Sequence, residues 1–188
     1  MVVSDALKKR KKIWVSILAP KEFKEKEVGE SYVYLHEQVL GKTIEVNLSN
    51  LIGDPKKQNI NVLLRVKEIK ENKAHTEMIA YTLAPSYLKR LTRMNKGRAE
   101  QSLALKTKDG KKLRIKALAL TKFEPQNSIL TAVRTKMKEL LIANVQSNTF
   151  EDLMNGVIGY EFQKVLSKEL KSIYPLSYVL IRYVKLTK

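Results

Sequence analysis

Basic side chains alternate with apolar ones on both sides of an Asp-Gly turn signal in the stretch LALKTKDGKKLRIKALALTK, residues 103–122. A two-residue period of this kind predicts a β-hairpin with one apolar face and one face of lysine and arginine. Ammonium and guanidinium groups gathered on one face can bind phosphate by charge and hydrogen bonding. The pattern therefore indicates anion binding, although lysines that only keep a sheet face solvated would give the same alternation.

The length of the hairpin loop decides whether the charges separate from the core. A two-residue Asp-Gly loop would pair Leu105 with Arg114 and mix the two faces. A three-residue loop, Lys108–Gly110 with its glycine in the left-handed bulge position, pairs Leu105 with Leu113 instead. Because burial of one face sets the register, we predict the three-residue loop. The apolar face then consists of Leu103, Leu105, Leu113, Ile115 and Ala117.

Basic residues also gather in two other segments. The run KKRKK at residues 8–12 predicts a solvated arm, or a phosphate-binding arm where an anion holds it. The segment SYLKRLTRMNKGR at residues 86–98 predicts a basic helix with one apolar stripe, which Gly97 is placed to end. The candidate phosphate contacts from these segments, the hairpin and the last strand are Lys8, Lys9, Arg10, Lys11, Lys12, Lys89, Arg90, Arg93, Arg98, Lys106, Lys108, Lys112, Arg114, Lys116 and Arg182.

Residue types that catalysis or cofactor binding would need form no recognisable pattern. The two histidines, His36 and His75, lie in different predicted strands without a neighbour at metal-ligand spacing, and cysteine is absent. No glycine-rich nucleotide-binding motif or serine-nucleophile motif is present. Four glutamates between residues 22 and 30 are interleaved with lysines and predict a solvated loop. We therefore predict no enzyme, no metal, no cofactor and no small-molecule substrate.

The net charge of the chain is +17 over 188 residues, with 36 Lys and Arg against 19 Asp and Glu. Self-repulsion of this size weakens the compact state and favours a partner of opposite charge. We favour nucleic acid over an anionic membrane surface and over a protein that is merely basic. Lysine, a point charge, far outnumbers arginine, whose bidentate fork reads bases. The expected mode is recognition of the backbone and shape of structured RNA.

Short segments rich in β-branched and aromatic residues predict strands, and longer amphipathic segments predict helices. Helices are expected over residues 129–144, after the capping pattern Thr149-x-x-Asp152, and along the apolar stripe from Phe162 to Ile173. Strands are expected at residues 13–18, 32–36, 42–48, 61–70, 74–82 and 178–186, in addition to the hairpin. The order predicts an α+β fold with a small closed or partly closed β-barrel of about six to eight mostly antiparallel strands and packed helices.

The domain organisation expected from this pattern is a basic arm at residues 1–12 and one α+β domain at residues 13–188. That domain is β-rich over 13–122, helical over 128–174 and closed by a strand at 178–186, which returns to the sheet. Hydrophobic residues make up 44% of the chain, enough to bury a core. No apolar run has the length of a signal peptide or a membrane span, so we expect a cytoplasmic protein.

Four stretches of the sequence share features with a known family: KKIWVSILAPKEF (11–23), GKTIEVNLSNLIGD (41–54), TKDGKKLRIKALALTK (107–122) and IYPLSYVLIRYVK (173–185). In this order and at fitting separations, they resemble the archaeal and eukaryotic small-subunit ribosomal protein family S-three-A-e, also designated e-S-one. The resemblance implies a non-enzymatic component of the small ribosomal subunit, built on a β-barrel with helices. It implies a place on the platform near the 3′ end of the rRNA and the mRNA exit, with rRNA, neighbouring platform proteins and, near the exit, mRNA as partners.

Matching positions carry the family's motifs over to this chain, and most of them are expected to shape the fold. Among these matching positions, only Arg182 and Lys185 are expected to contact phosphate. The sequence stops shortly after Lys185, where eukaryotic members continue into a longer tail, so it resembles archaeal members. The matching positions are Trp14, Ala19, Pro20, Phe23, Thr107, Asp109, Gly110, Tyr174, Pro175, Leu176, Val179, Arg182, Val184 and Lys185.

Two other functions compete with a structural ribosomal role. A free-standing RNA-binding factor that associates transiently with subunits would show the same charge. An RNA-processing enzyme would need catalytic carboxylates, for which the sequence offers only generic candidates.

Overall fold

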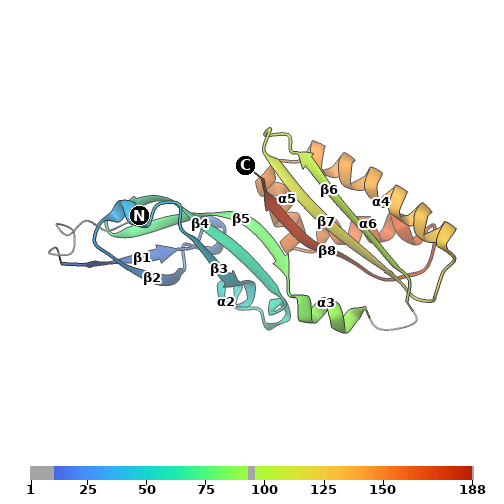
Figure 1. Cartoon of the computed structure of the whole chain (residues 1–188), viewed down its shortest axis with the longest axis horizontal. Coiled ribbons are helices and arrows are strands. Elements are labelled where there is room, and N and C mark those ends of the chain that lie inside the picture. Colours follow the sequence, from blue (N-terminus) through green and yellow to red (C-terminus); the bar gives the residue numbers. More distant parts are fainter. Residues whose placement is uncertain (1–10, 93–95, 188) are drawn as a thin grey trace. The chain divides into compact units, whose positions relative to one another are not determined.

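The computed structural model describes residues 11–92 and 96–187 of the chain (Figure 1). The chain divides into two compact units, the first ending at Ala80 and the second starting at Tyr81. Residues 13–188, for which the sequence suggests one domain, are thus shared between two units.

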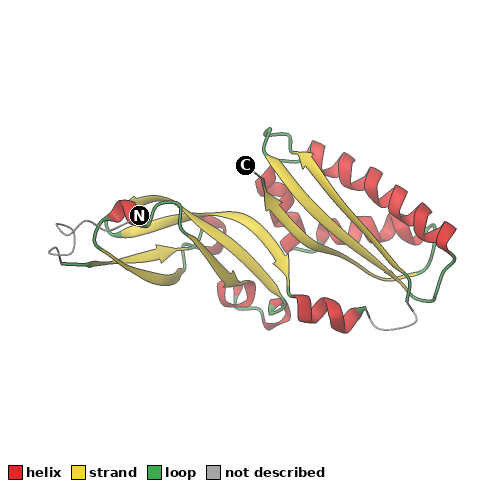
Figure 2. Cartoon of the chain, in the orientation of Figure 1, coloured by secondary structure: helices red, strands yellow, loops and turns green. Residues whose placement is uncertain are grey.

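The first unit consists of strands and short helices (Figure 2). β1 is antiparallel to β2 and parallel to β5, β5 also pairs with β4, and β4 is antiparallel to β3. The elements in chain order are β1 (Ile13–Leu18), η1 (Lys21–Phe23), β2 (Glu27–Val33), η2 (His36–Gln38), β3 (Thr43–Asn47), α2 (Leu48–Ile52), η3 (Pro55–Lys57), β4 (Ile60–Lys70) and β5 (Lys73–Leu83), whose last three residues belong to the second unit.

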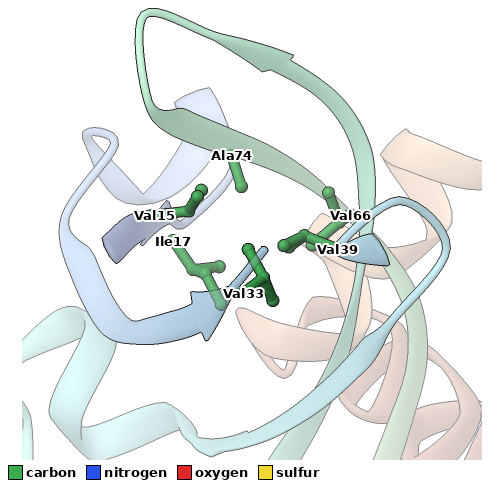
Figure 3. Close-up of a cluster of buried hydrophobic side chains, with 6 residues drawn as sticks. All are labelled: Val15, Ile17, Val33, Val39, Val66 and Ala74. Atoms are coloured by element: carbon green, nitrogen blue, oxygen red, sulfur yellow. The ribbon is translucent and has the colours of Figure 1, made fainter. Parts of the chain in front are cut away.

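Small aliphatic side chains fill one core of the first unit (Figure 3). β1 contributes the alternate residues Val15 and Ile17, because successive side chains of a strand point to opposite faces, and β2 contributes Val33. The other members are Val39, Val66 and Ala74. The other face of β1 therefore carries the intervening residues, which begin with Trp14.

The second unit places the antiparallel strands β6, β7 and β8 against helices. β7 lies between β6 and β8, and α4 and α6 lie along one face of this sheet (Figure 1). The elements are α3 (Pro85–Leu91), β6 (Arg98–Lys106), β7 (Lys112–Thr121), α4 (Asn127–Ser147), α5 (Phe150–Ile158), α6 (Glu161–Lys171) and β8 (Leu176–Leu186). The predicted return of the last strand to the sheet is confirmed, as is the Thr149 cap of α5, whose Oγ1 accepts the Asp152 N–H at 3.2 Å.

The predicted barrel is wrong, although the α+β class holds: the eight described strands form an open sheet. In the second unit, α4 and α6 cover the apolar face that a barrel would have turned inward, so closure is not needed to bury it. The predicted strand at 32–36 is also wrong, because β2 runs from Glu27 to Val33 and a 3-10 turn follows at His36–Gln38. Glu27 and Glu30, expected in a solvated loop, are strand residues with exposed side chains.

Gly97 does not end the predicted helix, which stops earlier, at Leu91. Gly97 is buried, and its N–H donates to Thr121 Oγ1 at 2.7 Å. A Cβ at this position would lie 2.4 Å from Pro125 Cδ and 2.9 Å from Thr121 Oγ1. The glycine thus allows the start of β6 to pack closely against the end of β7 and the segment after it.

Gly97→Ala is expected to lower the free energy of unfolding by about 1–3 kcal/mol, because a methyl group is forced into a filled space. The matched change Gly156→Ala adds a Cβ with nothing within 4 Å inside α5. It should raise the free energy of unfolding by about 0.4–1 kcal/mol by restricting the unfolded chain. Denaturant unfolding of both variants measures the difference, and equal values would contradict the close packing at Gly97.

Candidate nucleic-acid interface

The hairpin between β6 and β7 closes through the predicted three-residue loop. The Thr107 N–H donates to the Lys111 carbonyl at 3.0 Å, and the Gly110 N–H donates to the Thr107 carbonyl at 2.9 Å. Gly110 has a φ of 74°, the left-handed value that a bulge of this type requires. Leu105 is opposite Leu113, so the predicted register is confirmed.

The register sorts charge from core in the half of the sheet next to the hairpin loop. On β7, Leu113 and Ile115 are fully buried, whereas Arg114 between them is exposed. β8 continues this separation, because Lys185 is opposite Arg114 and Tyr183 is opposite Lys116. We call the cations on the side away from α4 and α6 the basic face: Lys106, Lys112, Arg114, Lys116, Arg182 and Lys185.

Like charges are directly opposite one another on the basic face. Lys106 is opposite Lys112, and Arg114 is opposite Lys185. Cross-strand neighbours lie close enough to interact, and pairs of equal charge destabilise the sheet. An anion that bridges two such residues removes this repulsion, so the arrangement is suited to binding phosphate groups.

A bulge in β8 adds Arg182 to the basic face. Lys116 pairs with Tyr183 and the next residue, Ala117, pairs with Ile181, so Arg182 has no partner on β7. In a regular strand Arg182 would point to the face opposite that of Tyr183, because side chains alternate along a strand. With the bulge, Arg182 and Tyr183 line the same hollow of about 230 Å³, together with Arg114 and Lys116. The Lys116 ammonium lies 5.7 Å from the centre of the Tyr183 ring.

Helix α3 brings the predicted basic helix to the edge of this surface. Pro85 occupies its first turn, where a missing N–H costs nothing, and Leu88 is buried. Lys89 lines a second hollow of about 190 Å³ with Arg98 and Arg182. The neighbouring Arg90 is exposed, with its guanidinium 5.2 Å from the centre of the Tyr87 ring. The hollows thus connect α3 with the sheet.

One acidic residue, Glu100, lies among these cations and was not singled out from the sequence. It forms ion pairs with Arg98 and, at 3.6 Å, with Arg182. All three side chains are partly exposed, so each pair contributes little to stability. Their effect is to hold two guanidinium groups at the second hollow.

The hairpin loop is fixed by its contacts with α5 and the segment before it. Lys108 is exposed and its N–H donates to the Asn148 carbonyl at 3.2 Å. The Asp109 carboxylate accepts the Phe150 N–H at 3.1 Å, at the start of α5. A negative charge at a helix N-terminus is favourable. The turn aspartate therefore caps a helix, a role that depends on a contact 41 residues along the chain.

The structure brings together only part of the predicted set. Lys8, Lys9, Arg10 and Arg93 lie outside the described residues. Lys11 and Lys12 belong to the first unit, where both are exposed. The remaining candidates lie on the second unit, on the basic face, on α3, at the start of β6 or in the hairpin loop.

Exposed aromatic residues of the first unit were missed by the sequence-based selection. Trp14 is 59% exposed and Tyr32 is 51% exposed, although the family motif predicted a structural role for Trp14. Two features of the sequence could have indicated that Trp14 is exposed. Basic residues precede it in the chain, and it alternates with Val15, which is buried.

In the part of the chain that the structure describes, Tyr81 and Glu68 have shifted pKa values, and neither residue is on the basic face. Burial raises the pKa of Tyr81, and the nearby Tyr160 and Tyr87 add to the effect. A hydrogen bond from Lys70 to Glu68, 3.1 Å long, lowers the pKa of that exposed carboxyl.

Within residues 11–92 and 96–187, no group of three or more His, Asp or Glu side chains could hold a metal ion. None of the helices described in these ranges is long and apolar enough to cross a membrane.

Comparison with known proteins identifies the family. The model of the Ribosomal S3Ae family matches residues 3–188. A protein named small ribosomal subunit protein eS1 from Halorubrum lacusprofundi is 30% identical, over 95% of this chain and 83% of its own length. Proteins of the same name from Methanocaldococcus jannaschii and Nanoarchaeum equitans are 29% and 26% identical, each over 92% of this chain and over 78% and 87% of their own lengths. The chain therefore belongs to the Ribosomal S3Ae family.

Proposed function

We propose that this chain is a structural, non-enzymatic constituent of the small ribosomal subunit that binds rRNA through the basic face. The observation that carries the proposal is the pairing of like charges across β6, β7 and β8, with Lys106 opposite Lys112 and Arg114 opposite Lys185. Family membership supports the ribosomal part, since the relatives are named small ribosomal subunit proteins.

Phosphate contact is the mode of binding that this surface favours. Lysines supply point charges along the hairpin, while Arg114 and Arg182 offer bidentate forks at the 230 Å³ hollow. Because the cations project from paired strands, the backbone that carries them is already ordered before RNA binds. Contacts of this kind fix register and orientation on RNA and read sequence only secondarily.

The location that we propose follows the family resemblance. The protein lies on the platform of the cytoplasmic small subunit, near the 3′ end of the rRNA and the mRNA exit. Neighbouring platform proteins are its protein partners, and mRNA passes nearby. The hairpin loop and α3 supply phosphate contacts next to the basic face.

Sucrose-gradient fractionation of cell extract tests the proposal. The chain should sediment with small subunits in a one-to-one ratio and remain bound in moderate salt. A free-standing factor would be substoichiometric and would dissociate in moderate salt. Recovery only in the soluble fraction at low salt would rule out a ribosomal constituent, and divalent-dependent RNA cleavage by the purified protein would point to an enzyme.

A further inference from the structure

An aromatic stack is exposed on the first unit, on the face of β1 and β2 opposite the core of Figure 3. Trp14 on β1 is directly opposite Tyr32 on β2. Their ring centres are 4.6 Å apart and their planes are inclined by 30°. Each residue is about half exposed or more, so the stacked rings present a large apolar surface to solvent and are not part of the core.

A lysine ammonium is held beside this stack. Lys12 Nζ lies 5.0 Å from the centre of the Tyr32 ring and 4.9 Å from the centre of the Tyr34 ring. The rings and the Lys12 ammonium together combine a flat stacking surface with positive charge.

We propose that this group, Lys12, Trp14, Tyr32 and Tyr34, is a stacking site for one unpaired RNA base. The proposal rests on the proposed rRNA binding and deepens it by assigning a base contact to the first unit. The base stacks on the exposed ring of Trp14 and continues the Trp14–Tyr32 stack, while Lys12 contacts a neighbouring phosphate. Aromatic side chains on sheet surfaces accept bases in this way because every base has a π-face.

Size and charge favour a base over a protein partner. The next cross-strand pair on the same face is polar, Ser16 opposite Glu30, so the apolar surface of the rings is interrupted there. A stable protein interface needs about 800 Å² on each partner, far more than two half-exposed rings provide. A single base matches the rings in size, and its phosphate is opposite in charge to the Lys12 ammonium.

The experiment uses Trp14 as its own reporter, because it is the only tryptophan of the chain. The full-length protein is titrated with an unstructured oligoadenylate and with an abasic ribose-phosphate oligomer of the same length and charge. The oligoadenylate should quench the fluorescence of Trp14, and the abasic oligomer should bind with much less quenching. Equal quenching by both would overturn the proposal.

A variant pair separates stacking from charge. Trp14→Leu should weaken binding of a labelled oligoadenylate by roughly tenfold or more. It should leave the salt dependence of binding unchanged, since no charge is removed. The control is Phe123→Leu, which changes an aromatic residue of the second unit that is 58% exposed and has Lys122 5.4 Å from its ring centre. This control should bind like the wild type.

The outcomes distinguish this inference from the proposed function. If Trp14→Leu binds oligoadenylate normally while neutralisation of the basic face weakens binding, the stacking site is wrong and the proposed function stands. If Trp14→Leu binds RNA normally but no longer joins small subunits, the aromatic group binds a protein, which also overturns the inference. Loss of affinity in Trp14→Leu with an unchanged salt slope supports it.

Discussion

Neutralising four cations of the basic face should flatten the salt dependence of RNA binding. Each phosphate contact contributes about 0.7–0.9 to the slope of log affinity against log salt, because it releases condensed counterions. Loss of all four contacts should therefore lower the magnitude of the slope by about 3–4. The measurement is a titration of structured rRNA fragments at several salt concentrations. The residues to be changed to glutamine are Lys106, Lys112, Arg114 and Lys116.

A matched variant removes the same charge from another surface. Four exposed lysines on α4 and α6 are changed to glutamine, so that the net charge falls equally. If attraction to RNA came only from the overall charge of +17, both variants would lose the same slope. We expect the slope to fall less in the matched variant than in the variant of the basic face. Equal falls in the slope would mean that the basic face is only solvated. The residues of the matched variant are Lys138, Lys164, Lys168 and Lys171.

Ile115→Ala is expected to cause the largest loss of stability that we predict for a single substitution. Ile115 is fully buried on β7, directly behind the basic face and between Arg114 and Lys116. Truncation of a buried isoleucine costs about 2–5 kcal/mol through lost apolar contact and the cavity left behind. Thermal or denaturant unfolding measures the change.

The matched control for this change is Ile173→Ala, the same truncation after α6, where the side chain is 37% exposed. It should change the free energy of unfolding by less than about 0.5 kcal/mol, since surface substitutions seldom do more. Similar losses of unfolding free energy for the two variants would show that the β7 core does not support the basic face. An Ile115→Ala variant as stable as the wild type would lead to the same conclusion.

The hairpin was predictable because its register follows from local burial. A shift by one residue would have exchanged Leu113 and Ile115 with Arg114 and Lys116, so only one loop length kept the charges in solvent. The helices after Pro125 were predictable for a similar reason, because apolar residues at helical spacing must face a core. Both features depend on residues close together in the chain.

Sheet closure was not predictable in the same way. Whether strands form a barrel depends on pairings between residues far apart, such as the parallel pairing of Ile17 with Ala74. The extent of β2 was misjudged because Glu27 and Glu30 look like loop residues, yet they occupy the exposed positions of a half-buried strand. Local composition does not distinguish a closed sheet from an open one, or an exposed strand position from a loop position.

The candidate site was only partly predictable, because charge is visible in a sequence while its surroundings are not. The basic residues of the hairpin were identified from their alternation with leucines. The ion pairs of Glu100, the Asp109 cap and the exposure of Trp14 all depend on contacts between distant segments. Trp14 was assigned to the fold because it matches a family motif most of whose positions are expected to shape the fold.

The bulge at Arg182 makes this cation an addition to a strand that is already complete. Tyr183 and Ile181, on either side of it, have consecutive partners on β7, namely Lys116 and Ala117. If Arg182 were deleted, the two flanking residues would join in regular antiparallel order without changing face. One codon thus separates a sheet with this guanidinium from a sheet without it, and the anion-binding strength of the surface can change by insertion or deletion while the core stays as it is.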